Sequence, residues 1–138
     1  MTRSNLQRAA LAMLLGVSFG LANAEDVKVT LTGDQEVPAV TTDAKATGKI
    51  TIKADKSVSG KLAATGIDGT MAHIHMAPVG KNGPPIITLE KGADGKWSVP
   101  EGSKLTGDQY EAFKSGNLYV NVHSAAHKGG EIRTQLKP

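Results

Sequence analysis

The chain has 138 residues, four histidines, no cysteine and a formal net charge of +3. The lack of cysteine excludes disulfide scaffolds, thiolate metal sites and a lipid anchor on cysteine, so any metal site must use nitrogen, oxygen or methionine sulfur. Aromatic residues make up only 4% of the chain and the lysines are scattered singly, which excludes the basic, aromatic-rich surface typical of nucleic-acid binding.

Residues 1–24 have the organisation of a secretory signal peptide. Arg3 and Arg8 form a basic n-region, an apolar run of about 13 residues follows, and residues 22–24 form a small-x-small cleavage site. The apolar run is too short to span a membrane. We therefore expect cleavage after Ala24 and a periplasmic or secreted mature protein, residues 25–138, with no membrane span. Removing the two arginines lowers the formal net charge from +3 to about +1.

The rest of the chain predicts short strands separated by turns. Apolar and polar residues alternate with a period of two in most of these segments, as expected for half-buried strands. Gly- and Pro-rich segments at 33–40 and 80–85 predict loops. A turn at 92–95 predicts a hairpin between the segments on either side of it. The predicted strands cover residues 27–31, 48–53, 58–67, 71–76, 86–89, 96–99, 118–123 and 131–136.

One short helix interrupts the strands. Thr106 and Gln109 have the spacing of a capping box, Tyr110 and Phe113 share a helix face, and Gly116 suits the C-terminal stop. About eight short strands with turn signals between them predict an all-β protein, an antiparallel sandwich or barrel, with this one helix added.

The strand at 71–76 carries two of the four histidines. Successive side chains on a strand point to opposite faces, so His73 and His75 share one face while Ala72 and Ile74 share the other. Ala72 and Ile74 suit a core, so we expect the histidines to point outward. Cα atoms two residues apart on a strand lie roughly 6.6 Å from each other, which lets both imidazoles reach one metal ion.

The strand at 118–123 carries the third histidine. Its apolar face holds Val120 and Val122, and its other face holds Asn121 and His123. If this strand neighbours the strand at 71–76, the three histidines share one surface. His127 follows in a loop and would be an optional fourth ligand.

Glu131 and Arg133 lie on the polar face of the last predicted strand. We expect them to form an ordinary surface ion pair. In the alternative, Arg133 donates to loop carbonyl groups through its fork of N–H donors.

Three motifs stand out along the chain: LTGDQEVP at 31–38, AHIH at 72–75 with GKNG at 80–83, and YVNVH at 119–123 with GEIR at 130–133. Taken in this order, they resemble the CHRD (chordin-type) domain family. The resemblance covers almost all of residues 25–138 and implies an all-β, immunoglobulin-like sandwich or barrel. It also implies an exported, single-domain bacterial protein of a family with no established enzymatic activity. The chain departs from the usual pattern at Lys128, where proline is common, and at Thr134, where glycine is usual.

Two classes of function follow from these observations. The first is an exported metal-binding module that holds copper or zinc; imidazole sites without thiolate suit both ions, and intrinsic affinity favours copper. The second is a structural module or a module that binds an extracytoplasmic protein, without metal. A superoxide dismutase-like metalloenzyme is a weaker third hypothesis, because four histidines are few for a two-metal site. The pattern predicts no catalytic residues and leaves the oligomeric state open. The predicted metal ligands are His73, His75, His123 and His127.

Overall fold

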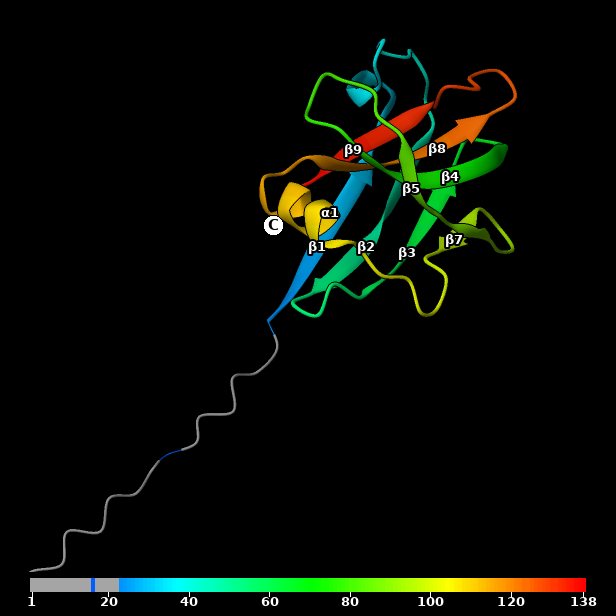
Figure 1. The fold of residues 1–138 in the computed structure, drawn as a ribbon. Coiled ribbons are helices and arrows are strands. Elements are labelled where there is room, and N and C mark those ends of the chain that lie inside the picture. The colour runs from blue at the N-terminus through cyan, green and yellow to red at the C-terminus, as the bar shows by residue number, and fades with distance from the viewer. Residues whose placement is uncertain (1–15, 17–22) are drawn as a thin grey trace, which may run out of the picture.

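The computed structural model describes Gly16 and residues 23–138. Within residues 23–138, nine strands form two antiparallel sheets that face each other as a sandwich (Figure 1). The larger sheet has the strand order β1-β2-β3-β7-β6, and the smaller sheet has the order β5-β4-β8-β9. Neither sheet closes on itself, so of the two predicted architectures the sandwich is correct and the barrel is not.

All eight predicted strands form, and one short strand, β6, is added to them. In the larger sheet the strands are β1 (Ala24–Leu31), β2 (Lys45–Lys53), β3 (Val58–Thr65), β6 (Glu90–Lys91) and β7 (Lys96–Ser98). In the smaller sheet they are β4 (Gly69–Met76), β5 (Pro85–Thr88), β8 (Leu118–Ser124) and β9 (Ile132–Leu136). The helical elements of this part of the chain are the single turn η1 (Gly33–Gln35) and the helix α1 (Gly107–Lys114).

The predicted hairpin between residues 86–89 and 96–99 is wrong. β5 pairs with β4, whereas β7 pairs with β3 and with the short β6. The chain passes from one sheet to the other at Leu89, whose side chain is buried and whose N–H donates to the carbonyl of Ala72 (2.9 Å). An alternating pattern identifies a strand, but its partner depends on which edge of the two sheets remains open to it.

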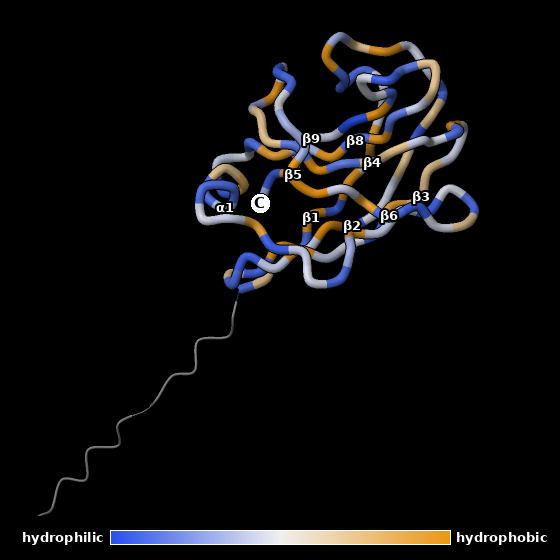
Figure 2. The backbone as a smooth tube through the Cα atoms, turned by 45° about the vertical axis from the view of Figure 1, so that its right-hand side comes forward, coloured by the Kyte–Doolittle hydropathy of each residue, from blue (hydrophilic) through white to orange (hydrophobic). Residues whose placement is uncertain are grey.

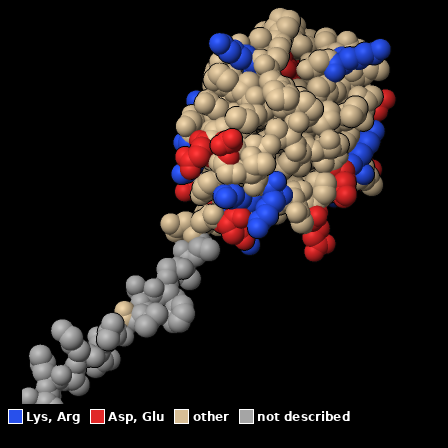
Figure 3. Space-filling view, in the orientation of Figure 1, with Lys and Arg blue, Asp and Glu red and all other residues tan. Residues whose placement is uncertain are grey.

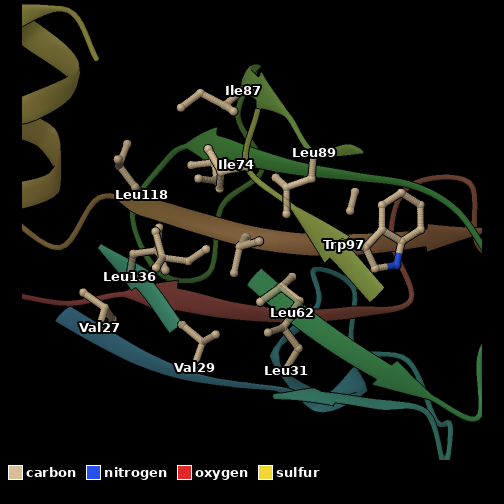
Figure 4. Packing of buried hydrophobic residues seen from close by; sticks show 14 of the residues in the cluster. Val27, Val29, Leu31, Leu62, Ile74, Ile87, Leu89, Trp97, Leu118 and Leu136 are labelled. Carbon is tan, nitrogen blue, oxygen red and sulfur yellow. The ribbon is translucent and has the colours of Figure 1, made fainter. Parts of the chain in front are cut away.

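Apolar side chains from both sheets fill the space between them (Figure 4). The single tryptophan, Trp97, lies at one end of this layer and is 3% exposed. The alternation of polar and apolar residues along the strands is visible in Figure 2. The core residues predicted from that alternation are all buried: Ile50, Ile52, Leu62, Ile74, Val120, Val122, Ile132 and Leu136.

The helix α1 begins and ends as its sequence predicts. Thr106 Oγ1 accepts a hydrogen bond from the Gln109 N–H (3.2 Å), and Gln109 Oε1 accepts one from the Thr106 N–H (2.9 Å), which completes the capping box. Gly116 has φ +74°, a left-handed conformation that glycine adopts without strain and that stops the helix. Phe113 is fully buried, so the helix packs beside the sandwich near the C-terminus (Figure 1).

The predicted signal peptide falls almost entirely outside the described residues. Its last residue, Ala24, is described: it begins β1 and lies opposite Lys53 of β2. A helix that is long and apolar enough to cross a membrane does not occur among the described residues.

The register of β4 can be tested on the strand itself. Ile74 is completely buried, so Ile74→Ala should lower the free energy of unfolding by about 2–5 kcal/mol. Met71 is 50% exposed on the opposite face, so Met71→Ala should change it by less than about 0.5 kcal/mol. Urea unfolding followed by Trp97 fluorescence measures both values. Equal losses in the two variants would contradict this register.

Candidate metal centre

The pairing of β4 with β8 brings the three strand histidines together. Met71 lies opposite His123, and His73 lies opposite Asn121, so the side chains of His73, His75 and His123 project from the same face of the smaller sheet. Each of these histidines offers one ring nitrogen, and the three nitrogens lie within 4.8 Å of one another. The two histidine-bearing strands, β4 and β8, are therefore neighbours, which the sequence alone could not show.

The sequence predicts that the three histidines lie on an exposed surface, but the structure buries them. They lie on the face away from the core, but each is only 7–9% exposed. Loops at residues 32–44, 77–84 and 125–131 gather on this side of the smaller sheet (Figure 1). The alternation of the strand separates the two faces correctly, but it carries no information about loops that cover the second face.

Two loop carbonyl groups orient two of the imidazole rings. His75 Nδ1–H donates to the carbonyl of Gly83 (2.9 Å), and His123 Nδ1–H donates to the carbonyl of Lys128 (2.8 Å). A ring that donates from Nδ1 keeps its lone pair on Nε2, which is the usual arrangement of a histidine that binds a metal. Lys128 acts through its carbonyl, so a proline there would offer the same acceptor.

His73 joins the group through its Nδ1 atom, whereas His75 and His123 use their Nδ1 atoms to bind loop carbonyl groups. Its Nδ1 lies 3.1 Å from His123 Nε2, and since that Nε2 carries a lone pair, His73 Nδ1–H is the donor. Bonds of 2.0–2.1 Å place the nitrogens of a four-coordinate ion roughly 3.3 Å apart. The His73–His123 pair already has nearly this separation, and small ring rotations would bring in His75. Binding requires His73 to carry its proton on Nε2.

Burial favours the neutral form of two of these rings, His73 and His75. It lowers the pKa of His73 and of His75 below the ordinary value of 6.5, and the neighbouring imidazole of His123 lowers both further. The hydrogen bond to Gly83 opposes this effect at His75 by raising its pKa. Neutral imidazole is the form that binds a metal, so burial keeps His73 and His75 in the binding form to a lower pH than an ordinary histidine.

His127 does not belong to the group of three ring nitrogens that meet. Its backbone closes the turn after β8: its N–H donates to the carbonyl of Ser124 (3.2 Å), and its carbonyl accepts from the Gly130 N–H (3.0 Å). Its side chain lines a hollow of about 370 Å³ together with Glu36. Its role as an optional ligand stays a prediction.

Arg133 does not form the expected ion pair with Glu131. Its guanidinium is 1% exposed, lies 3.4 Å from the centre of the Tyr119 ring, and donates to the carbonyl of Lys81 (2.7 Å) and to Asn82 Oδ1 (3.1 Å). The alternative, that Arg133 binds loop carbonyl groups, is therefore correct. Arg133 fixes the loop at 77–84 over the site, and that loop carries the carbonyl that orients His75.

Glu131 holds a second loop. Its carboxylate accepts hydrogen bonds from Ser124 Oγ (2.7 Å) and from Thr42 Oγ1 (2.8 Å). Asn82 Nδ2 also donates to the carbonyl of Val37 (2.7 Å), which joins the loop at 77–84 to the loop at 32–44. The cover over the histidines is thus one connected structure.

Sequence reasoning missed Glu36 and gave no role to Tyr119, which alternation places on the same face of β8 as His123. The Tyr119 ring stacks on His75 with their centroids 4.6 Å apart and an interplanar angle of 2°. Glu36 is 5% exposed, and burial raises its pKa to about 7 although Arg133 and Asn121 both act to lower it. A glutamate in a predicted loop is ordinarily solvated; the only signal was its place inside the first family motif.

Glu36 should make stability depend on pH. Its folded pKa lies above the unfolded value near 4.5, so its contribution is fully present below pH 4.5 and is lost as the pH rises through about 7. Glu36→Gln should therefore raise the melting temperature at pH 8 by on the order of 5 °C, with a much smaller gain at pH 5. Calorimetry at both pH values measures this, with the exposed Glu101→Gln as control. A gain that is equal at both pH values would contradict the burial of the charge.

A family model for the CHRD domain matches residues 27–136. Neither the curated proteins nor the solved structures compared with the chain gave a match. The matched region runs from within β1 to the end of β9, so it contains both sheets, the three covering loops and all four histidines. The family resemblance carried by the three sequence motifs is thereby confirmed, and the chain belongs to the CHRD domain family.

Proposed function

We propose that this CHRD domain is an exported binding module that holds one copper or zinc ion through His73, His75 and His123. The observation that carries the proposal is the convergence of three ring nitrogens within 4.8 Å on a buried face. Loop carbonyl groups hold two of these rings from behind, and His75 Nε2 is buried without any hydrogen-bond partner. An unpartnered buried acceptor costs about 1–3 kcal/mol, and a bound ion would relieve that cost.

The chemistry of the ligands supports a first-row transition metal. Neutral imidazoles suit Cu(II) and Zn(II), and intrinsic affinity favours copper. On the face seen in Figure 3, charged side chains of both signs lie around an uncharged centre. The fixed lone pairs of His75 and His123, and not a field of negative charge, would then attract the cation.

Family membership supports export, because CHRD domains are typically extracellular. We propose that the signal peptide is cleaved after Ala24 and that the domain binds its ion without catalysis.

The alternative, a module that binds another extracytoplasmic protein without metal, also has an observation in its favour. The hydrogen bonds of His75 and His123 to Gly83 and Lys128 would by themselves fix the two loops that cover the sheet. In that case the histidines would be structural. Metal titration separates the two functions.

Titration of the mature domain with Cu(II) and with Zn(II) tests the proposal. We expect one ion per chain and a rise in melting temperature with ion concentration, because the folded chain presents the ligands together. His73→Ala/His75→Ala should lower the affinity on the order of 100-fold or more, since even the loss of an outer partner of a ligand costs 10–100-fold. Affinity should change little between pH 8 and pH 6.5 and fall at lower pH than it would for free imidazole, because burial lowers the pKa of His73 and His75 and only protonated imidazole fails to bind.

Isothermal titration calorimetry with a competing chelator measures these affinities. The exposed pair Thr47→Ala/Lys49→Ala on β2 serves as a matched double substitution far from the site in the fold. Equal, weak binding by the wild type and the double histidine variant would contradict the metal site and leave the protein-binding alternative.

His123 and His127 should differ in their contributions. His123→Ala removes a ring whose Nε2 lies 3.1 Å from His73, and we expect a loss of affinity on the order of 100-fold. His127→Ala removes a loop side chain that a water molecule can replace, so the loss should be less than about tenfold. The same titration measures both variants. A larger loss from His127→Ala than from His123→Ala would show that the ion lies in the hollow beside Glu36.

A further inference from the structure

Three buried side-chain atoms in the described part of the chain have no hydrogen-bond partner, and they belong to neighbouring residues. They are Glu36 Oε1, His75 Nε2 and Asn121 Oδ1. The exposed fractions of these residues are 5%, 7% and 1%. An isolated unpartnered atom is a local defect, but here Asn121 interacts with both Glu36 and His75, so the unpartnered atoms of connected residues indicate a missing group.

Asn121 lies at the centre of this arrangement. It pairs across the sheet with His73 on one side and with Arg133 on the other. Its side chain therefore projects from the same face as the three histidines, on β8, between His73 of β4 and Arg133 of β9.

The carboxyl group of Glu36 orients the amide of Asn121. A Cβ atom added to Gly130 would lie 2.5 Å from both Asn121 Nδ2 and Glu36 Oε1, so the amide nitrogen and the carboxyl oxygen lie on either side of the space above Gly130, with no hydrogen bond between them. The amide nitrogen is the donor end of Asn121 and a carboxylate oxygen attracts it, so Nδ2 is the end of the amide that faces Glu36. Oδ1 then points the other way, toward the histidines. In agreement with this, the Asn121 side chain raises the pKa of His75, as an oxygen acceptor beside the ring does.

Two acceptors thus face one space with no donor between them. His75 has its proton on Nδ1, bound to Gly83, so its Nε2 presents a lone pair. Asn121 Oδ1 also presents lone pairs. A cation satisfies both acceptors at once, and it is the same cation that the three imidazoles surround.

We propose that Asn121 is the fourth protein ligand of the ion, bound through Oδ1, and that Glu36 is the positioning residue that holds the amide in this orientation. This inference rests on the proposed metal-binding function. Three nitrogens and one amide oxygen form a ligand set that suits divalent Cu(II) and Zn(II) better than Cu(I), which prefers soft sulfur ligands. Glycine at position 130 is required, since any side chain there would displace the amide or the carboxyl group.

Substitution of Asn121 tests the ligand. Asn121→Leu keeps the approximate volume but removes the oxygen, and we expect at least a tenfold loss of affinity for Cu(II) and for Zn(II). Asn121→Asp keeps an oxygen at the same position and should bind at least as tightly as the wild type. Asn117→Leu, a matched change just before the same strand, should have no effect. Glu36→Leu, which frees the amide to rotate, should lower the affinity less than Asn121→Leu does.

A measurement on the wild-type protein does not depend on how the variants fold. On titration with Zn(II), the side-chain ¹³Cγ and ¹H–¹⁵N resonances of Asn121 should shift and stop shifting at one equivalent, while those of Asn117 stay in place. An affinity loss in Asn121→Leu without a ¹³Cγ shift in the wild type would overturn direct ligation. Unchanged affinity in Asn121→Leu would overturn the role of Asn121 and leave the three-histidine site intact. Absence of Zn(II) and Cu(II) binding by the wild type would overturn both.

Discussion

The buried guanidinium of Arg133 is the constraint on which the site depends. A charge that is 1% exposed must be compensated inside the protein, because the loss of its hydration costs several kcal/mol. Arg133 finds its partners in the loop at 77–84 and in the face of Tyr119. Fixing that loop places the Gly83 carbonyl behind His75, and Tyr119 stacks on the same imidazole. One buried cation therefore determines the position of a ring that it does not touch.

The outer face of the smaller sheet behaves as a second, polar interior. Loops cover it, and Thr42, Asn82 and Glu131 tie these loops to the sheet and to one another. Most polar groups in this layer are paired, which makes the few unpaired ones informative. Each costs about 1–3 kcal/mol in the absence of a partner, and an ion bound by His75 and Asn121 would relieve two of these costs.

This layer contains titratable groups whose pKa values burial shifts in opposite directions. Burial lowers the pKa of His73 and His75, so their contribution to stability is present above pH 6.5 and is lost as the pH falls through their lower folded values. Burial raises the pKa of Glu36 to about 7, so its contribution changes in the opposite direction. His73 and His75 therefore favour the uncharged form at neutral pH, whereas Glu36 changes between its two forms near pH 7. Arg133 is a buried positive charge in the same layer.

The sequence by itself determined the strands, the core face of each strand and the helix. Ile74 and Val120 are buried because alternation and apolar character act over a few residues, and the capping box of Thr106 and Gln109 is equally local. The three motifs also determined the family. His73 and His75 could be paired from their spacing, since two positions along a strand always share a face.

Only the tertiary structure decided which strands are neighbours and what covers them. The meeting of His123 with His73 depends on the pairing of β8 with β4, fifty residues apart, and the partner of β5 was predicted wrongly for the same reason. The burial of Glu36 and the separation of Arg133 from Glu131 depend on where three loops come to rest. These contacts join residues distant in sequence, and no local pattern carries the loop-closure and desolvation free energies that select them.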